Sequence, residues 1–411
     1  MPAHDADFDP ARAIANARQL KPAQGSLHTP IDPSATFDVE RATDLPKLFT
    51  HELNPDEHGR YLYGRPLNPT VHALATKLAA MEATEAAACA ASGISVIAAC
   101  AMHHCKPGER ILASQALYGG TFSLFSRFLP NHAGLTVDFV DMGDLGAVRA
   151  AITDSTRMLY VETMSNPTLR VADIPALATI ARGAGAPLVV DNTFSPITVA
   201  PALHGADVVI HSLTKFINGA TDLLGGVLCG PKALIDEMQD LHDGALMLLG
   251  SAMDARVAHE IAARLPHLPL RIEEHCKRAL LYAQRLHERG MRVVYPGLAN
   301  HPSYETLSRI HNERYGFGGM LGLDMGDRER ADRLLDLLRA KGFGRIAVSL
   351  GFHDTLMCVA GATTASGMDA ASRERVGVSP GYIRFAIGIS GAVEDRWAAM
   401  EQSLDALDAH H

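Results

Sequence analysis

Short apolar runs alternate with amphipathic stretches between about residues 70 and 260. The runs that predict strands are apolar at consecutive positions, at 110–114, 136–140, 158–161, 188–190, 208–210 and 226–228. Such strands are buried on both faces, which is typical of a mostly parallel sheet covered by helices. Segments rich in Ala and Leu predict those helices at 71–82, 94–105, 144–153 and 174–184. The pattern therefore predicts an α/β fold.

The two ends of the chain follow other patterns. Residues 1–67 contain several prolines and little periodicity, which predicts an extended N-terminal arm that lies on another surface, often a second subunit. Pro266 and Pro269 interrupt a helical pattern, so we place a boundary there. This gives a large domain at 68–265 and a smaller α+β domain at 266–411. In the smaller domain we expect helices at 271–289, 328–341 and from 393, and strands at 318–323 and 382–387.

Composition excludes several classes of protein. The chain has 411 residues, of which 47% are hydrophobic and 20% charged, so disorder over most of it is not expected. A net charge of −9 leaves no basic surplus for nucleic acid. There is no apolar run of about 18 residues to cross a membrane, and the acidic N-terminus is no secretory signal. Six cysteines without a C-x-x-C motif fit reduced thiols in the cytoplasm.

Lys215 directly follows one of the predicted strands, in the segment Ser212-Leu213-Thr214-Lys215. Ligands collect at the carboxyl ends of strands in open α/β sheets. A partly desolvated amine there can lose its proton and attack a carbonyl, while the hydroxyls of Ser212 and Thr214 can donate to a phosphate. A surface lysine after a strand, with two turn hydroxyls, would produce the same pattern.

Asp191 ends the neighbouring strand and raises the expectation of a cofactor site. A carboxylate at the end of a buried strand needs a cation or hydrogen bonds. Together, Lys215 and Asp191 suit pyridoxal 5'-phosphate (PLP), which a lysine holds covalently. The aspartate keeps the pyridine nitrogen protonated, so that the ring can accept electrons from a substrate carbanion. The alternative is an aspartate that caps a helix.

Two glycine-containing segments could complete this site. Ser92-Gly93-Ile94 precedes an apolar helix, whose first N–H groups and dipole favour an anion, although ordinary helix starts look alike. Tyr118 stands before Gly119 and Gly120, where it could stack on a flat ring or serve as a core aromatic beside a turn.

Taken in order, these motifs resemble the Cys/Met-metabolism (trans-sulfuration) family of fold-type I PLP enzymes, from about residue 35 to the C-terminus. The family includes methionine γ-lyase, cystathionine γ-synthase, the cystathionine lyases and O-acetylhomoserine sulfhydrylase. The resemblance implies a mostly parallel seven-stranded sheet between helices, a smaller C-terminal α+β domain, and PLP as the cofactor.

The resemblance also implies roles for individual residues. Lys215 would hold the cofactor and move protons, Asp191 would pair with the pyridine nitrogen, and Tyr118 would stack on the ring and protonate the leaving group. In the segment from Glu162 to Pro167, Asn166 would contact the ring hydroxyl. The implied phosphate contacts are Ser212, Thr214, Gly93 and Ile94. The implied substrate-carboxylate contacts are Ser349 and Arg384, with Arg384 binding in bidentate fashion.

Tyr63 and Arg65 lie in a segment that resembles the motif through which this family reaches the phosphate of a neighbouring subunit. The resemblance therefore implies an obligate dimer with active sites at its interface, usually assembled as a homotetramer of two dimers.

Several positions depart from the family pattern. Val348 replaces the Glu that members handling cystathionine often carry, and Gly120 replaces the Cys usual in methionine γ-lyases. Gly219-Ala220 stands where Gly-His is frequent, and 359–362 lacks the frequent His-Pro-Ala-Ser. The wall of the substrate pocket is therefore expected to be atypical.

We expect γ-elimination from a γ-substituted L-amino acid such as methionine or an O-substituted homoserine, canavanine included. A γ-replacement synthase that joins activated homoserine to a thiol shares every residue above. A metal hydrolase is suggested by the 20 histidines, but His51-Glu52 lacks the second histidine of a zincin helix, and the adjacent His103-His104-Cys105 lacks ligand spacing. Intact Lys215, Asp191 and Arg384 argue against a non-catalytic binding protein.

Overall fold

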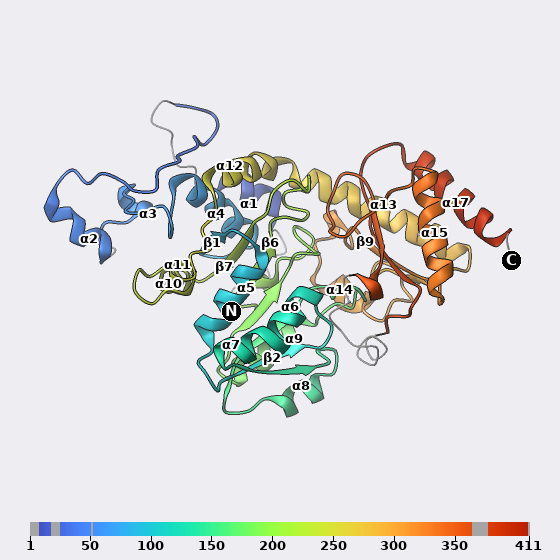
Figure 1. Ribbon diagram of the computed structural model, residues 1–411, viewed down its shortest axis with the longest axis horizontal. Coiled ribbons are helices and arrows are strands. Elements are labelled where there is room, and N and C mark those ends of the chain that lie inside the picture. The colour runs from blue at the N-terminus through green and yellow to red at the C-terminus, as the bar shows by residue number, and fades with distance from the viewer. Residues whose placement is uncertain (1–7, 18–24, 51, 364–376, 410–411) are drawn as a thin grey trace.

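The computed structural model describes residues 8–17, 25–50, 52–363 and 377–409 (Figure 1). Its larger sheet has seven strands in the order β1-β7-β6-β5-β4-β2-β3. All neighbouring strands pair in parallel except where β7 pairs with β1 and β6. The strands are β1 Ala86–Ala90, β2 Arg110–Ser114, β3 Thr136–Val140, β4 Thr156–Glu162, β5 Leu188–Asp191, β6 Val208–Ser212 and β7 Gly226–Gly230. The predicted mostly parallel sheet is confirmed.

Helices cover both faces of this sheet and enclose a separate apolar core on each. One core packs α4 (Pro69–Met81), α9 (Ile174–Gly183) and α12 (Ala255–Arg264) against alternate strand residues such as Val161, Val190 and Val209. The other packs α5 (Gly93–His104), α7 (Leu129–Ala133) and α10 (Lys232–Met238) against the intervening residues, such as Tyr160, Val189 and Ile210. Burial on both faces explains why the strands read as continuous apolar runs.

The predicted helices lie within three residues of their expected bounds. The sheet's other helices are α6 (Gly119–Ser123), α8 (Leu145–Ala151) and α11 (Ala245–Leu248). The described part of the arm also contains α1 (Pro10–Asn16), α2 (Leu45–Phe49) and α3 (Pro55–His58), which the sequence pattern did not predict. Figure 1 shows α2 and α3 projecting from the body of the molecule.

A second sheet lies at the end of the molecule opposite α2 and α3 (Figure 1), with the strand order β10-β11-β12-β9-β8. Its strands are β8 Val293–Val294, β9 Met320–Asp324, β10 Arg345–Ile346, β11 Leu356–Val359 and β12 Tyr382–Ala386. Its helices are α13 Leu268–Glu288, α14 Tyr304–Ile310, α15 Arg328–Ala340 and α17 Val393–Asp408. Only β9 and β12 were predicted, because the other strands span two to four residues and show no period.

The two prolines of the proposed boundary lie in a short link between helices. Pro266 is in the 3₁₀ turn Leu265–His267 that follows α12, and Pro269 is in the first turn of α13, where its missing N–H breaks no hydrogen bond. The division of the chain after residue 265 stays a prediction.

Two further features concern the cysteines and the character of the helices. All six cysteines are free. Within the described ranges, none of the helices combines the length and the apolar character needed to span a bilayer.

Candidate active site

Lys215 lies just beyond the carboxyl end of β6, where its Nζ donates a hydrogen bond to Ser349 Oγ at 3.1 Å. Burial, and then the positive charge of Arg384, lower the pKa of the Lys215 amine. Ser349 has a left-handed φ of +83°, and a Cβ on Gly351 would lie 2.8 Å from the carbonyl carbon of Lys215. The 349–351 segment therefore packs directly on the lysine and presents it with a hydroxyl.

Asp191 lies at the carboxyl end of the adjacent strand β5. Its Oδ1 accepts hydrogen bonds from Thr193 N at 3.0 Å and Thr193 Oγ1 at 2.5 Å, and its Oδ2 accepts one from Tyr160 Oη at 3.2 Å. Burial raises the pKa of the Asp191 carboxyl, while the bonds from Thr193 lower it. No Lys or Arg of the described residues forms an ion pair with Asp191. A half-buried carboxylate that no Lys or Arg neutralises fits the protonated ring nitrogen of PLP.

Glu162, at the end of β4, joins two of the predicted site residues through their backbones. Its Oε1 accepts from Tyr118 N at 2.7 Å, and its Oε2 accepts from Asn166 N at 2.9 Å. Burial and the neighbouring Asp191 raise the pKa of Glu162 to about 8. The carboxyl of Glu162 therefore fixes the backbone of Tyr118, the residue expected to stack on the ring, relative to that of Asn166, the residue expected to contact the ring hydroxyl.

The N-terminus of α5 packs tightly on the end of β6, where a phosphate cradle was expected. Ser92 caps the helix, and Gly93 is its first residue. A Cβ on Gly93 would lie 2.9 Å from Ser212 Cβ, which is closer than real Cβ contacts. Thr214 faces the same region, with its Oγ1 accepting a hydrogen bond from Gly225 N at 3.2 Å. The first N–H groups of a helix beside two hydroxyls fit a phosphate, and Ile94, which follows the buried Gly93, is exposed there.

Arg384 is buried on β12 and reaches across to the group around Lys215. Its Nη1 donates to Asn166 Oδ1 at 3.2 Å and its Nη2 to Ser349 O at 2.8 Å. Its Nε is buried without a hydrogen-bond partner among the described residues, and no carboxylate of that part of the chain pairs with it. A buried guanidinium with an unused donor fits the carboxylate of an amino-acid substrate.

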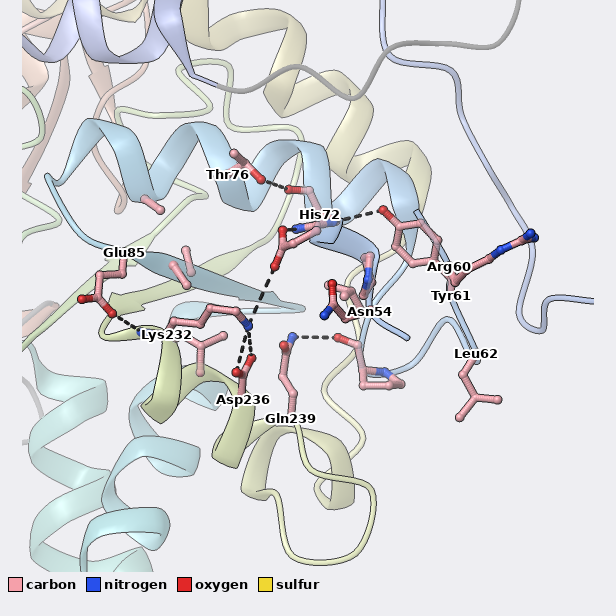
Figure 2. Close-up of a pocket in the computed structure, with 18 of the residues that line it drawn as sticks. Asn54, Arg60, Tyr61, Leu62, His72, Thr76, Glu85, Lys232, Asp236 and Gln239 are labelled. Atoms are coloured by element: carbon pink, nitrogen blue, oxygen red, sulfur yellow. Dashed lines mark hydrogen bonds and ion pairs between the residues drawn. The ribbon is translucent and has the colours of Figure 1, made fainter. Parts of the chain in front are cut away.

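Tyr63 and Arg65 are placed elsewhere. The Arg65 guanidinium lies 5.5 Å from the centroid of the Tyr63 ring, and within the described part of the chain no hydrogen bond or ion pair joins either residue to the group around Lys215. Tyr63 lines a cavity of about 650 Å³ between the arm, α4 and α10 (Figure 2). One lysine of that cavity, Lys232, pairs with two of its carboxylates, Asp236 at 2.7 Å and Asp56 at 3.8 Å (Figure 2). The role of Tyr63 and Arg65 at a neighbouring subunit stays a prediction.

The histidines that suggested a metal hydrolase do not form a cluster in the described ranges. There, no group of three or more His, Cys, Asp or Glu side chains is arranged to hold a metal ion. His103 lies 3.5 Å from Glu237 and packs edge-on against His104. His51 lies outside the described residues.

The strand order, the smaller second sheet and the grouping at the carboxyl ends of β4, β5 and β6 define the class, a PLP enzyme of fold type I. The chain belongs to the family of Cys/Met metabolism PLP-dependent enzymes, whose model matches residues 11–405. PLP is accordingly its cofactor.

Similar proteins in this family include both lyases and synthases. The chain is 45% identical to methionine gamma-lyase of Arabidopsis thaliana, covering 97% of this chain and 90% of that protein. It is 34% identical to O-succinylhomoserine sulfhydrylase of Pseudomonas aeruginosa, covering 95% and 94%. Among solved structures, cystathionine gamma synthase from Xanthomonas oryzae pv. oryzae, in complex with aminoacrylate and cysteine, has a TM-score of 0.86 and 28% identity. That alignment covers 98% of this chain and 99% of the other.

Sequence reasoning assigned no role to Tyr160 and Thr193, although both bond to Asp191. Tyr160 appeared only as one residue of an apolar strand. Strand alternation offered a signal, because Tyr160 and Glu162 are two residues apart and face the same side of the sheet.

Gly120 controls the orientation of Tyr118. A Cβ at Gly120 would lie 2.5 Å from Tyr118 Cε1, so the ring must turn if any larger residue stands there. We expect Gly120→Ala to lower kcat about tenfold at saturating cofactor, because the turned ring of Tyr118 would leave the position predicted for stacking on the cofactor and for protonating the leaving group. The measurement is steady-state kinetics together with thermal melting.

Gly183→Ala is the matched control for Gly120→Ala. Gly183 is also helical, and a Cβ there meets no atom within 4 Å, so this change should leave kcat unaltered. A wild-type kcat in the Gly120→Ala enzyme would contradict the prediction that turnover depends on the space that Gly120 leaves for the ring of Tyr118.

Proposed function

We propose that this enzyme is a lyase that eliminates the γ-substituent of an L-amino acid such as methionine or an O-substituted homoserine, with canavanine a further candidate. One observation carries the proposal: Arg384 donates to the backbone of the same residue, Ser349, whose hydroxyl receives the hydrogen bond of Lys215. An amino acid held by its carboxylate on Arg384 therefore has its Cα and Cβ beside the Lys215 amine.

The residues divide the work as follows. PLP supplies an electron-accepting ring that stabilises negative charge on the substrate carbons. Lys215, with its lowered pKa, takes protons from Cα and Cβ near neutral pH. Asp191 holds the proton of the ring nitrogen, and Asn166 binds the ring hydroxyl. Tyr118 donates a proton to the departing γ-group. With water, methionine would give 2-oxobutyrate, methanethiol and ammonia.

The similar proteins favour elimination from a small substrate. Relatives named methionine gamma-lyase are 45% and 34% identical over nearly the whole chain. Val348, which precedes Ser349, is exposed and carries no charge for the distal ammonium of cystathionine. A γ-replacement synthase is the second candidate, because the sulfhydrylase and cystathionine gamma synthase relatives also align over nearly the whole chain.

Assembly and compartment belong to the same proposal. The arm exposes Leu27, Ile31, Leu45 and Phe49, and its Arg65 lies over the ring of Tyr63, which is also exposed. An exposed apolar arm suits contact with a second copy, so we propose a homotetramer of two dimers with active sites at the dimer interface. The free thiols suit a reducing compartment, and we place the enzyme in the cytoplasm.

Elimination and replacement differ in their need for a thiol. The test incubates the enzyme with O-acetyl-L-homoserine, L-cystathionine or L-canavanine, each with and without methanethiol, and identifies the products by mass spectrometry. We expect the four-carbon keto acid from O-acetyl-L-homoserine without thiol. A thioether formed only when thiol is present would instead establish the synthase, and homoserine from canavanine would identify a specialised lyase.

A further inference from the structure

A buried polar cluster lies behind the cofactor site and has no part in the chemistry above. Glu82 follows the last residue of α4, and its Oε1 lies 2.7 Å from His211 Nε2 and accepts from Asn192 Nδ2 at 3.3 Å. Thr163 Oγ1 donates to Asn192 Oδ1 at 2.8 Å. All four side chains are at most 1% exposed. The cluster therefore joins α4 to three strand ends without contact with water.

The cluster lies on the face of the sheet opposite to the cofactor residues. Strand side chains alternate between faces, so Thr163, Asn192 and His211 point toward the core of α4. Their chain neighbours Glu162, Asp191 and Ser212 point toward the core of α5. Each strand end thus carries one residue on the cofactor side of the sheet and, next to it, one residue of the cluster.

Such a cluster is costly for stability alone. Burying a carboxylate and an imidazole carries a large desolvation penalty, and apolar residues of similar volume often stabilise a core as well or better. Glu82 Oε2 and His211 Nδ1 are buried without a hydrogen-bond partner among the described residues, which adds to the cost. The position of the cluster directly behind the cofactor residues suggests a role other than stability.

We propose that Glu82 and His211 are positioning residues, which clamp the ends of β4, β5 and β6 from behind. The clamp would hold Asp191 and Ser212 at fixed separations from the cofactor, and it would fix Glu162, which in turn holds the backbones of Tyr118 and Asn166. The clamp is matched on the cofactor face, where Thr193 Oγ1 donates to Asp191 Oδ1 at 2.5 Å and accepts from Ser212 N at 2.9 Å. Asn192 transmits the position of Glu82 to Asp191, its neighbour in the chain. His211 does the same for Ser212.

The test measures cofactor binding rather than turnover. Holoenzymes of the wild type and of Glu82→Gln are resolved to apoenzyme and titrated with PLP, and the absorbance spectrum of each reconstituted holoenzyme is recorded. We expect the dissociation constant for PLP to rise at least about tenfold in Glu82→Gln, the effect of weakening a charge-assisted hydrogen bond, and the band of bound cofactor to shift. Thermal melting of each apoenzyme measures the effect on folding.

Glu274→Gln is the matched control, because Glu274 pairs with the buried Arg278 at 2.6 Å on α13 and undergoes the same chemical change. Its affinity for PLP should equal that of the wild type. If Glu82→Gln melts earlier but binds PLP with wild-type affinity and spectrum, the cluster is only structural and the proposal is wrong.

Thr163→Val provides a second route if Glu82→Gln does not fold. It removes the bond to Asn192 and preserves the shape of the side chain. Weaker PLP binding at an unchanged apoenzyme melting temperature would support the clamp, and unchanged binding would overturn it. The inference rests on the cofactor site of the proposed function, but binding is read without substrate, so failure of γ-elimination and failure of the clamp are separate results.

Discussion

Lys215→Ala is expected to lower turnover by at least about a thousandfold, because the variant loses both the covalent attachment of the cofactor and the base that moves protons on the substrate. The Lys215 amine lies beside Ser349 and has a lowered pKa. Its neighbours among the described residues are the hydroxyl of Ser349 and the charge of Arg384, and neither is a second amine that could replace it. Initial rates measured with excess PLP give the loss. Mass spectrometry after borohydride reduction should find the cofactor on the wild-type chain and not on the variant.

A lysine far from the site is the control for this change. Lys341 is exposed just after α15, so Lys341→Ala should keep wild-type turnover and cofactor attachment. Turnover near the wild-type level in Lys215→Ala would refute the assignment of Lys215.

Arg384→Ala is expected to lower kcat/KM by about 10² to 10³, the cost of removing one member of a buried, hydrogen-bonded charge pair formed with the substrate carboxylate. The same change leaves Asn166 Oδ1 and Ser349 O without their donor. Because Ser349 contacts Lys215, we expect kcat to fall as well as KM to rise. Steady-state kinetics with the best substrate separates the two.

Arg384→Lys keeps the charge but not the planar fork of donors. It should recover only part of the loss, since a lysine reaches the carboxylate with one nitrogen. An Arg384→Ala enzyme whose KM is unchanged would place the substrate carboxylate elsewhere.

The larger sheet could be predicted because most of its strands are continuous apolar runs that alternate with predicted helices. β1 was missed because its sequence, Ala-Ala-Ala-Cys-Ala, has the composition of a helix, and only its pairing with β7 makes it a strand. The arm helices were missed because they span four to seven residues, too few for a period. In each case, contacts from outside the segment outweigh local preference.

In the candidate site, too, some residues could be predicted from the sequence and others could not. Lys215 and Asp191 could be expected together because parallel strands end at one edge of a sheet. The bond from Arg384 to Asn166 joins residues 218 apart, and only the family resemblance suggested that they meet. Nothing in the sequence pointed to Glu82, which lies at the end of an ordinary amphipathic helix and meets its histidine 129 residues later. Such pairings depend on how the layers pack.

The most direct measurement of the central claim is the product formed from L-methionine by the holoenzyme with no thiol added. We expect 2-oxobutyrate and methanethiol in equal amounts from the wild type, and neither from Lys215→Ala. No keto acid from methionine or from O-acetyl-L-homoserine, with a thioether appearing only when thiol is supplied, would contradict γ-elimination.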